Sequence, residues 1–331
     1  MCDVALAPAL IPALTECPSV TVVMAVRNEA DHIAASVRSV AAQTYPLGQV
    51  DIILADGMST DGTPAAAAGA AGEVRFVALH NAKRSTPAGL NVALATAAGA
   101  VILRLDGHAE LDPTYLEETV SELKRTGASV AGSRIRTRGH GRTGEAIAFA
   151  LSHPLVVGGA EFRYSGESKL AATVAFGAYR REVFAAVGSF REDVGRAEDL
   201  ELHHRIRRQG GQLLLLGQTL ATYWCRDTYG GLLRQYFASG RDMARHLRWA
   251  RPYQAVPALA LALEAAFIGA AWARWLPIWV PAAAAAAYAM LLAAVARQSS
   301  AYGVSAARTA LAVTVVHSGQ ALGFVYGLTT R

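Results

Sequence analysis

The sequence Val-Ile-Leu-Arg-Leu-Asp-Gly-His occupies residues 101–108, where an apolar run of strand length ends in an acid, a glycine and a histidine. If the chain stays extended there, Asp106 and His108 project from one face, because strand side chains alternate with a period of two. Ligands of open α/β sheets bind at the carboxyl ends of the strands. The stretch therefore predicts either a divalent-cation site at Asp106 and His108 or a solvated acid followed by a turn.

Short apolar segments alternate with segments of helical pattern on both sides of this stretch. Strands are predicted at 19–26, 51–55, 74–79 and 101–105, with helices at 32–42 and 86–98. Strands and helices that alternate at this spacing favour an α/β fold with a parallel sheet and right-handed crossovers. Later in the chain, strands are expected at 170–179 and 213–216, and helices at 199–209 and 230–249.

The C-terminal part of the chain has a different composition. Hydrophobic residues make up 53% of the 331 residues and charged residues only 17%, and the apolar excess lies mostly after Pro252. Ordinary soluble domains carry more charge than this. The segments 253–272, 278–296 and 304–328 are each long enough to span a bilayer. We therefore expect about three transmembrane helices; the alternative is a buried helical hairpin of a soluble protein.

The distribution of arginines predicts how these spans are oriented. The formal net charge is +5. The turn between the first two spans carries only Arg274, whereas arginines flank the other ends at positions 245, 248, 251, 297 and 308. Because basic residues concentrate on the cytoplasmic side, we expect the polar half of the chain in the cytoplasm, at a bacterial cytoplasmic membrane. The arginines cluster within residues 134–142 and 234–251. These clusters suit anionic phosphates or lipid headgroups, and no nucleic-acid motif accompanies them.

The remaining boundaries follow from cysteines, prolines and composition. Three scattered cysteines are too few for a disulfide framework or a zinc site, and they favour a reducing compartment. Residues 1–18 are interpreted as an irregular leader, because prolines interrupt its apolar stretch and no basic region precedes it. We predict an α/β domain at 19–229, an amphipathic interfacial helix at 230–251 and a transmembrane domain at 252–331.

Four polar segments fall where the expected strands end or where a helix begins. Residues 27–29 follow the first strand and Asp56 ends the second, while Asp106 and His108 follow a later one. The adjacent acids Glu198 and Asp199 start a helix, where negative charge is favoured by the helix dipole. Capping alone would explain that last pair. Together, the four segments predict one site at the carboxyl edge of the sheet.

These segments resemble the family-2 glycosyltransferases with a GT-A fold. Residues 21–29 (Thr-Val-Val-Met-Ala-Val-Arg-Asn-Glu) look like the family's opening strand, and residues 53–63 (Ile-Leu-Ala-Asp-Gly-Met-Ser-Thr-Asp-Gly-Thr) look like its second-strand motif. Residues 106–108 stand where the family has Asp-x-Asp, and residues 198–199 where it has Glu-Asp. The resemblance covers about residues 19–250 and implies a mixed, mostly parallel sheet flanked by helices. Residues 88–94, 106–110, 180–184 and 234–241, with the membrane tail, look like the succinoglycan-type exopolysaccharide glucosyltransferases.

The resemblance implies roles for particular residues. Glu29 and Asp56 would recognise the base and ribose of a nucleoside diphosphate sugar, with uridine expected. The donor-binding residues that it implies are Val26, Asn28, Glu29, Asp56, Asp106, Arg234, Gln235 and Arg241. The last three would lie over the diphosphate, because guanidinium groups suit phosphate oxygens.

The resemblance also implies a metal and a catalytic base. Asp106 and His108 would bind the metal, and His108 departs from the family-wide second acid. A neutral imidazole in place of a carboxylate favours Mn²⁺ over Mg²⁺. Asp199 would be the general base that takes the proton of the acceptor hydroxyl, with Glu198 as the alternative.

The resemblance thus implies an inverting, metal-dependent hexosyltransferase anchored in a membrane. It would move a hexose from a UDP-sugar to a polyprenyl-diphosphate-linked glycan in surface or exopolysaccharide biosynthesis, with membrane lipids as further partners. One alternative is a polyprenyl-phosphate sugar transferase. A second is an inactive nucleotide-sugar-binding scaffold of a membrane assembly complex.

Overall fold

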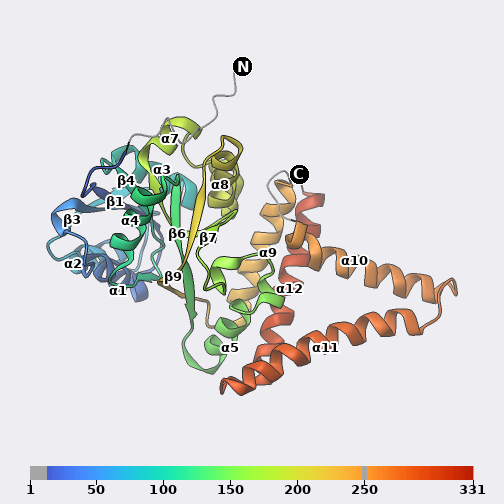
Figure 1. Ribbon diagram of the computed structural model, residues 1–331. Coiled ribbons are helices and arrows are strands. Elements are labelled where there is room, and N and C mark those ends of the chain that lie inside the picture. The colour runs from blue at the N-terminus through green and yellow to red at the C-terminus, as the bar shows by residue number, and fades with distance from the viewer. Residues whose placement is uncertain (1–12, 248–251, 331) are drawn as a thin grey trace. The chain divides into compact units, whose positions relative to one another are not determined.

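The computed structural model describes residues 13–247 and 252–330 (Figure 1). Most of the predicted leader, together with Arg248 and Arg251, therefore lies outside the described residues. The chain divides into two compact units, one formed by residues 1–136 and 164–223 and the other by residues 137–163 and 224–331. The segment 137–163, expected within the α/β domain, thus packs with the C-terminal helices.

The first unit begins with the parallel half of a mixed sheet. Its strands are β1 (Val20–Val26), β2 (Val50–Asp56), β3 (Arg75–His80) and β4 (Val101–Arg104), and β1 lies between β2 and β4 in parallel register. Strands β1, β2 and β4 are almost wholly buried, as expected for strands covered on both faces, whereas β3 at the edge of the sheet is partly exposed. The predicted parallel pairing is confirmed here.

The second half of the sheet is antiparallel. It contains β5 (Ala109–Leu111), β6 (Val130–Arg138), β7 (Lys169–Leu170), β8 (Ala175–Arg180) and β9 (Leu213–Trp224). The order is β3-β2-β1-β4-β8-β6-β9-β5, with β7 also beside β9. The single strand predicted at 170–179 is therefore two strands, β7 and β8, and β9 extends beyond the predicted 213–216.

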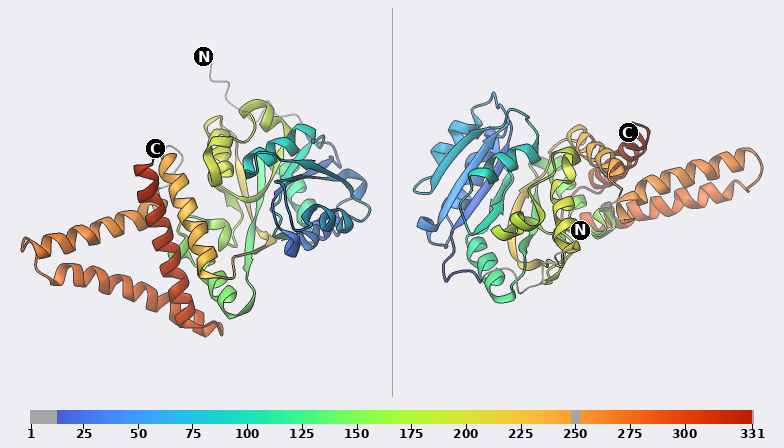
Figure 2. Two further views of the ribbon diagram at one scale, coloured as in Figure 1. Left: turned by 180° about the vertical axis from the view of Figure 1, so that it is seen from behind. Right: turned by 90° about the horizontal axis from the view of Figure 1, so that it is seen from above.

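Helices pack against the sheet of this unit (Figure 2). They are α1 (Ala30–Ala41), α2 (Thr63–Ala70), α3 (Thr86–Thr96), α4 (Tyr115–Thr126), α7 (Arg181–Val187) and α8 (Glu198–Arg208). A 3₁₀ segment at Glu192–Ala197 leads directly into α8. Both α1 and α8 thus begin beside the carboxyl ends of the parallel strands, where the predicted site residues lie.

The second unit is helical. It contains α5 (Gly141–Leu151), α6 (Pro154–Val157), α9 (Tyr229–Arg245), α10 (Pro252–Trp272), α11 (Trp279–Ala301) and α12 (Ala306–Thr329). By length and composition, α10, α11 and α12 are long and apolar enough to cross a membrane, which agrees with the three predicted spans. The predicted interfacial helix corresponds to α9 over its described length.

Glycines bring α12 close to α9. Gly319, Gly323 and Gly327 recur every fourth residue and so share one face of α12. A Cβ at Gly323 would overlap the carbonyl oxygen of Phe237, and one at Gly327 would overlap that of Arg241. Small residues at such positions allow two helix backbones to approach closely.

We expect Gly323→Ala to lower the thermal midpoint of the detergent-purified protein. Helix propensity alone favours alanine by about 1 kcal/mol, but forcing a methyl group into packed backbone costs typically about 1–3 kcal/mol. The matched control is Gly269→Ala in α10, because a Cβ there meets nothing within 4 Å. A midpoint that rises equally in both variants would show that α9 and α12 are not in close contact.

Candidate active site

Two loops meet where β1 and β2 end. The N–H of Asn28 donates to the Ser59 hydroxyl at 2.9 Å, and the Asn28 side-chain oxygen accepts from the N–H of Thr60 at 2.9 Å. Asn28 has a φ of 52°, a left-handed conformation that asparagine tolerates better than most residues. Asn28 therefore joins the two loops, and its predicted contact with a donor remains a prediction.

Asp56 ends β2 beside Val26, its register partner at the end of β1. The Asp56 residue is only 6% exposed, and one carboxylate oxygen, Oδ2, accepts from the N–H of Ser59 at 3.0 Å. The other oxygen, Oδ1, is buried and has no hydrogen-bond partner among the described residues. Buried acceptors are nearly always satisfied, so this oxygen points to a donor group supplied by a ligand.

The Asp-Gly-His segment forms a turn. Strand β4 ends at Arg104, and the N–H of Ala109 donates to the carbonyl of Asp106 at 3.2 Å. The chain thus does not stay extended from Asp106 to His108, and the turn that the sequence left as the alternative is the one observed as the chain enters β5. A Cβ at Gly107 would lie 2.9 Å from Val26 Cγ1, so the turn packs tightly against the end of β1.

His108 lies against Glu29. The Nδ1 atom of His108 is 3.1 Å from Glu29 Oε1, and the imidazole meets the Tyr223 ring edge-on. The N–H of Glu29 donates to the Thr63 hydroxyl at 2.8 Å, which fixes the backbone that carries this carboxylate. With Nδ1 facing a carboxylate, Nε2 is the ring nitrogen left for a ligand or metal, an arrangement common among metal-binding histidines.

Arg104 joins the two acidic motifs, and sequence reasoning missed it. Its Nη2 lies 3.0 Å from Asp106 Oδ1 and 2.9 Å from Glu198 Oε1, while Nη1 lies 3.4 Å from Asp199 Oδ2. Although burial opposes it, the carboxylates of these three acids raise the pKa of Arg104. An arginine inside an apolar strand was the signal in the sequence, because arginine is almost never fully buried unless paired.

Glu198 and Asp199 have different surroundings although they are adjacent. The Glu198 side chain is 5% exposed and its Oε2 is buried without a partner among the described residues, whereas the Asp199 side chain is 31% exposed. Burial raises the pKa of Glu198 to about 7; Arg104 opposes this shift, and the negative charge of Asp199 adds to it. Asp199 is therefore the more accessible carboxylate, and Glu198 holds a proton more readily.

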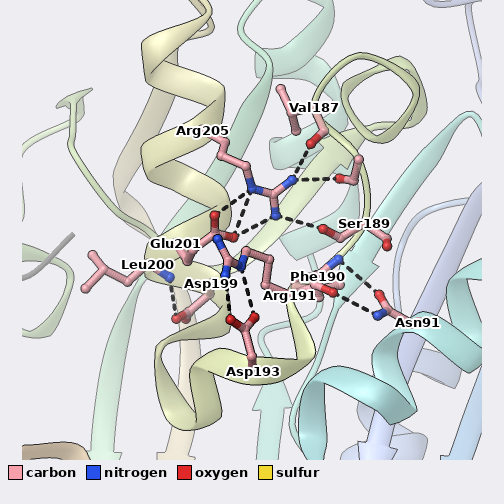
Figure 3. Close-up of polar contacts among 11 residues, drawn as sticks. Asn91, Val187, Ser189, Phe190, Arg191, Asp193, Asp199, Leu200, Glu201 and Arg205 are labelled. Carbon is pink, nitrogen blue, oxygen red and sulfur yellow. Dashed lines mark hydrogen bonds and ion pairs between the residues drawn. The ribbon is translucent and has the colours of Figure 1, made fainter. Parts of the chain in front are cut away.

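The segment before α8 is held by polar contacts that Figure 3 shows. Asn91 exchanges two hydrogen bonds with the backbone of Phe190, at 2.8 and 3.0 Å. Arg205 pairs with Glu201 at 2.7 Å and donates to the carbonyls of Val187 and Ser189. These contacts fix the start of α8, where Asp199 Oδ1 accepts from the N–H of Leu200 at 2.7 Å.

We expect Glu198→Gln to remove a pH dependence of stability. The raised pKa of Glu198 contributes stability that is complete below its ordinary value of 4.5 and is lost as pH rises through about 7. The thermal midpoint of the wild type should fall across this range more than that of Glu198→Gln, which stays neutral. Glu73→Gln, on the exposed surface, is the control. Parallel curves for all three proteins would contradict the assignment.

The described residues contain no cluster of three or more His, Cys, Asp or Glu side chains able to hold a metal. Asp106 and His108 nevertheless offer a carboxylate oxygen and an imidazole nitrogen, a donor set that suits a divalent cation. Such cations commonly take few protein ligands and complete their coordination with substrate phosphates. The residues present therefore fit a metal that binds together with a diphosphate.

Three predicted donor-binding residues lie in the second unit, on α9. Arg234 is exposed, and Arg241 pairs with Asp242 at 2.8 Å. Gln235 lies beside them on the same helix. The predicted contacts of Arg234, Gln235 and Arg241 with a diphosphate remain a prediction.

Sequence comparison identifies relatives. The family model described as Glycosyl transferase family 2 matches residues 21–188. The chain is 31% identical over 309 residues to the succinoglycan biosynthesis protein ExoA of Rhizobium meliloti (strain 1021). This match covers 90% of this chain and 91% of that protein. The family match includes the two loops at the ends of β1 and β2, the Asp106 turn and the β4 strand.

Comparison with solved structures identifies the same fold. The mannosyltransferase PcManGT from Pyrobaculum calidifontis, solved with GDP-Man and Mn²⁺, aligns with a TM-score of 0.58 and 21% identity over 95% of this chain and 90% of that one. Residues 1–349 of S. aureus TarS, solved with UDP-GlcNAc, align with a TM-score of 0.50 and 15% identity over 68% of this chain and 65% of that fragment. These likenesses are to the GT-A type of fold.

Proposed function

Because the chain belongs to glycosyl transferase family 2, we propose that it is an inverting hexosyltransferase that uses a nucleoside diphosphate sugar. Its acceptor is a glycan carried on a polyprenyl diphosphate, and its product belongs to surface or exopolysaccharide biosynthesis. The observation that carries the proposal is the convergence of Asp106, Glu198 and Asp199 on Arg104. This cluster combines Asp106, from the motif expected to bind the donor, with Asp199, from the motif expected to supply the general base.

The donor in this proposal is UDP-hexose. Asp56 Oδ1 is buried and has no partner in the part of the chain that the structure describes, so it suits the N–H of a uracil base, which would supply the missing hydrogen bond. Similar folds have been solved with UDP-GlcNAc and with GDP-Man, which supports a nucleotide sugar in general and uridine only by analogy. Glu29 contributes through His108, to which its carboxylate is joined.

Asp106 and His108 would hold the metal, with Mn²⁺ favoured. A bound divalent cation would neutralise charge on the leaving diphosphate. The imidazole is oriented for this by Glu29, whose carboxylate fixes the proton on Nδ1 and directs Nε2 toward a ligand.

Asp199 is the general base of the proposed reaction. Its carboxylate takes the proton of the acceptor hydroxyl as the acceptor oxygen forms a bond to the anomeric carbon. The bond from that carbon to the diphosphate oxygen breaks at the opposite face, so the configuration inverts and the nucleoside diphosphate leaves with the electron pair. Greater exposure favours Asp199 over Glu198, whose raised pKa makes it the weaker candidate at pH 7.

The three apolar C-terminal helices support the proposed acceptor and the proposed location. Three helices able to cross a membrane support an anchor that keeps the enzyme at the surface where a lipid-linked sugar is presented. We place the α/β unit in the cytoplasm of a bacterium, because Arg274 alone marks the turn between α10 and α11.

We expect His108→Ala to weaken Mn²⁺ binding about tenfold or more, as loss of an ordered ligand site usually does. His108→Asp should keep binding and respond to Mg²⁺ as well, because a carboxylate suits that cation. Mn²⁺ binding to the purified protein with UDP present, followed by electron paramagnetic resonance, measures both. His80→Ala, at the exposed end of β3, is the control. Equal Mn²⁺ affinity in all four proteins would show that His108 does not bind the metal.

The proposed function is tested by a donor screen. Purified protein is mixed with a membrane lipid extract, Mn²⁺ and each of several nucleotide hexoses, and released nucleotide is measured. We expect release with a UDP-hexose and a labelled lipid product that resists mild acid at the new glycosidic bond. A product in which mild acid releases the new sugar would identify a polyprenyl-phosphate sugar transferase. Absence of any turnover or hydrolysis would favour the binding scaffold.

A further inference from the structure

The two helices of the α10–α11 hairpin differ from α12 in how much of their surface is covered. Only 6% of the most apolar stretch of α10 and 11% of that of α11 is buried, against 50% for α12. The side chains left exposed on the hairpin are large and apolar, among them Leu263, Ile268 and Met290. Without a partner, such a surface belongs in the hydrocarbon of a bilayer.

Most of the covering of α12 comes from α9, which lies along its whole length, and α5, α10 and α11 contribute the rest. The contact starts where the Tyr229 hydroxyl donates to the carbonyl of Arg308 at 3.0 Å. It continues through the close approaches of Gly323 and Gly327 to α9, and it ends where Arg245 donates to the carbonyl of Thr330 at 3.1 Å. Any depth in a membrane reached by α12 is therefore also reached by α9.

Helix α9 is too polar to lie in hydrocarbon. Its 17 residues include Arg234, Arg241, Asp242 and Arg245, and Arg234 and Arg245 are exposed rather than buried against a neighbour. Charged side chains at the centre of a bilayer are costly and normally face a protein interior or an aqueous cavity. A helix with one charged and one apolar face instead lies at the membrane surface.

The hairpin leaves α12 from two separate points. Ala258 of α10 packs with Ala321 and Phe324 near the C-terminal end of α12, whereas α11 ends just before the N-terminal end of α12. Figure 1 shows α10 and α11 diverging from α12 and meeting at a turn away from it. The hairpin therefore separates from α12 toward its turn, although Tyr288 of α11 still reaches His317 of α12, with 3.3 Å between its hydroxyl and Nδ1.

We propose that only α10 and α11 enter the hydrocarbon of the bilayer, as a hairpin, and that α12 lies with α9 at the membrane surface. The chain then crosses the membrane twice, so residues before α10 and residues after α11 are on the same side. The proposal rests on the membrane attachment proposed above and specifies its topology.

The residues around the turn of the hairpin and the lengths of its two helices agree with this topology. Trp272, Trp275 and Trp279 surround the α10–α11 turn and are 89%, 83% and 65% exposed. Tryptophan is enriched at membrane–water interfaces, so these rings suit the interface on the far side. Helices of 21 and 23 residues are each about 30–35 Å long, which is the length needed to cross hydrocarbon.

Cysteine labelling distinguishes two crossings from three. In a background with all native cysteines replaced by serine, single cysteines are placed at the native position Cys17, at Arg274→Cys and at Thr329→Cys. Intact and permeabilised spheroplasts are treated with a membrane-impermeant maleimide. We expect Cys17 and Thr329→Cys to label together and Arg274→Cys to label in the opposite condition. Thr329→Cys labelling together with Arg274→Cys would overturn the proposal.

The same cells separate this result from failure of membrane attachment. If the protein is absent from carbonate-washed membranes, the attachment itself is wrong. If it is present but all three cysteines label together, the hairpin does not cross, and the proposal is overturned while attachment stands.

A matched pair of lysine substitutions tests the depth of α12. Met290 of α11 and Leu322 of α12 are 67% and 51% exposed. We expect Met290→Lys to lower the share of protein in carbonate-washed membranes several-fold, because its side chain would face hydrocarbon, and Leu322→Lys to leave that share unchanged. An equal loss in both variants would mean that α12 lies as deep as α11.

Discussion

Asp199→Asn should abolish sugar transfer while donor binding persists. Loss of a general base lowers kcat by typically about 10²–10⁴-fold. The amide oxygen of asparagine can still accept the hydrogen bond from the Leu200 N–H, so the start of α8 should keep its structure. The measurement is kcat with UDP-hexose and lipid acceptor, together with the dissociation constant of the donor by calorimetry.

The control for this variant is Asp193→Asn, in the segment just before α8. Asp193 is exposed and pairs with Arg191. Its substitution should leave kcat unchanged. Near-normal turnover by Asp199→Asn would transfer the role of base to Glu198, and loss of donor binding in Asp199→Asn would show that the residue acts in the donor site instead.

Arg104→Met should have the largest effect on the fold of the first unit. Arg104 is the one cation that the structure shows among Asp106, Glu198 and Asp199, and its side chain is only 12% exposed. Removing one partner of a buried ion pair costs typically about 3–5 kcal/mol, because the remaining charges stay buried without compensation. We therefore expect a lower thermal midpoint and loss of transfer activity.

The pH dependence of this loss separates electrostatics from packing. Arg104 holds the pKa of Glu198 down against the effect of burial, so its removal lets Glu198 take up a proton at higher pH. The destabilisation by Arg104→Met should thus be smaller at pH 5.5 than at pH 8. Arg75→Met, on exposed β3, is the control. A loss that is the same at both pH values would mean that Arg104 acts through its hydrophobic stem alone.

The parallel pairing of the first four strands and the apolar C-terminal segments were predictable, because both depend on local patterns in the sequence. Alternation of strand and helix segments fixes parallel pairing with little ambiguity, and a run of about 20 apolar residues has few other uses. The break between β7 and β8 was not predictable in this way. Its residues 171–174 continue the apolar pattern, and only the antiparallel partners β6 and β9 decide where pairing stops.

The candidate site was predictable in its residue types more than in its geometry. Asp106, His108, Glu198 and Asp199 were identified from motifs, and the first unit brings three of these four onto Arg104. The fourth, His108, turns away to Glu29, because the Asp-Gly-His segment bends, and the sequence had left an extended strand and a turn as alternatives there. A turn of this kind depends on how tightly Gly107 packs against β1, which the motif itself does not encode.

The sequence by itself determined the α/β order, the acids that end its strands and the three apolar helices, because each depends on residues that are neighbours in the chain. Only the tertiary structure decided that Arg104 pairs with acids 94 and 95 residues away and that half of the apolar stretch of α12 is buried, mostly against α9. Burial and ion pairing depend on which distant segments meet. For that reason the same apolar pattern describes α11, which is mostly exposed, and α12, which packs on a charged helix.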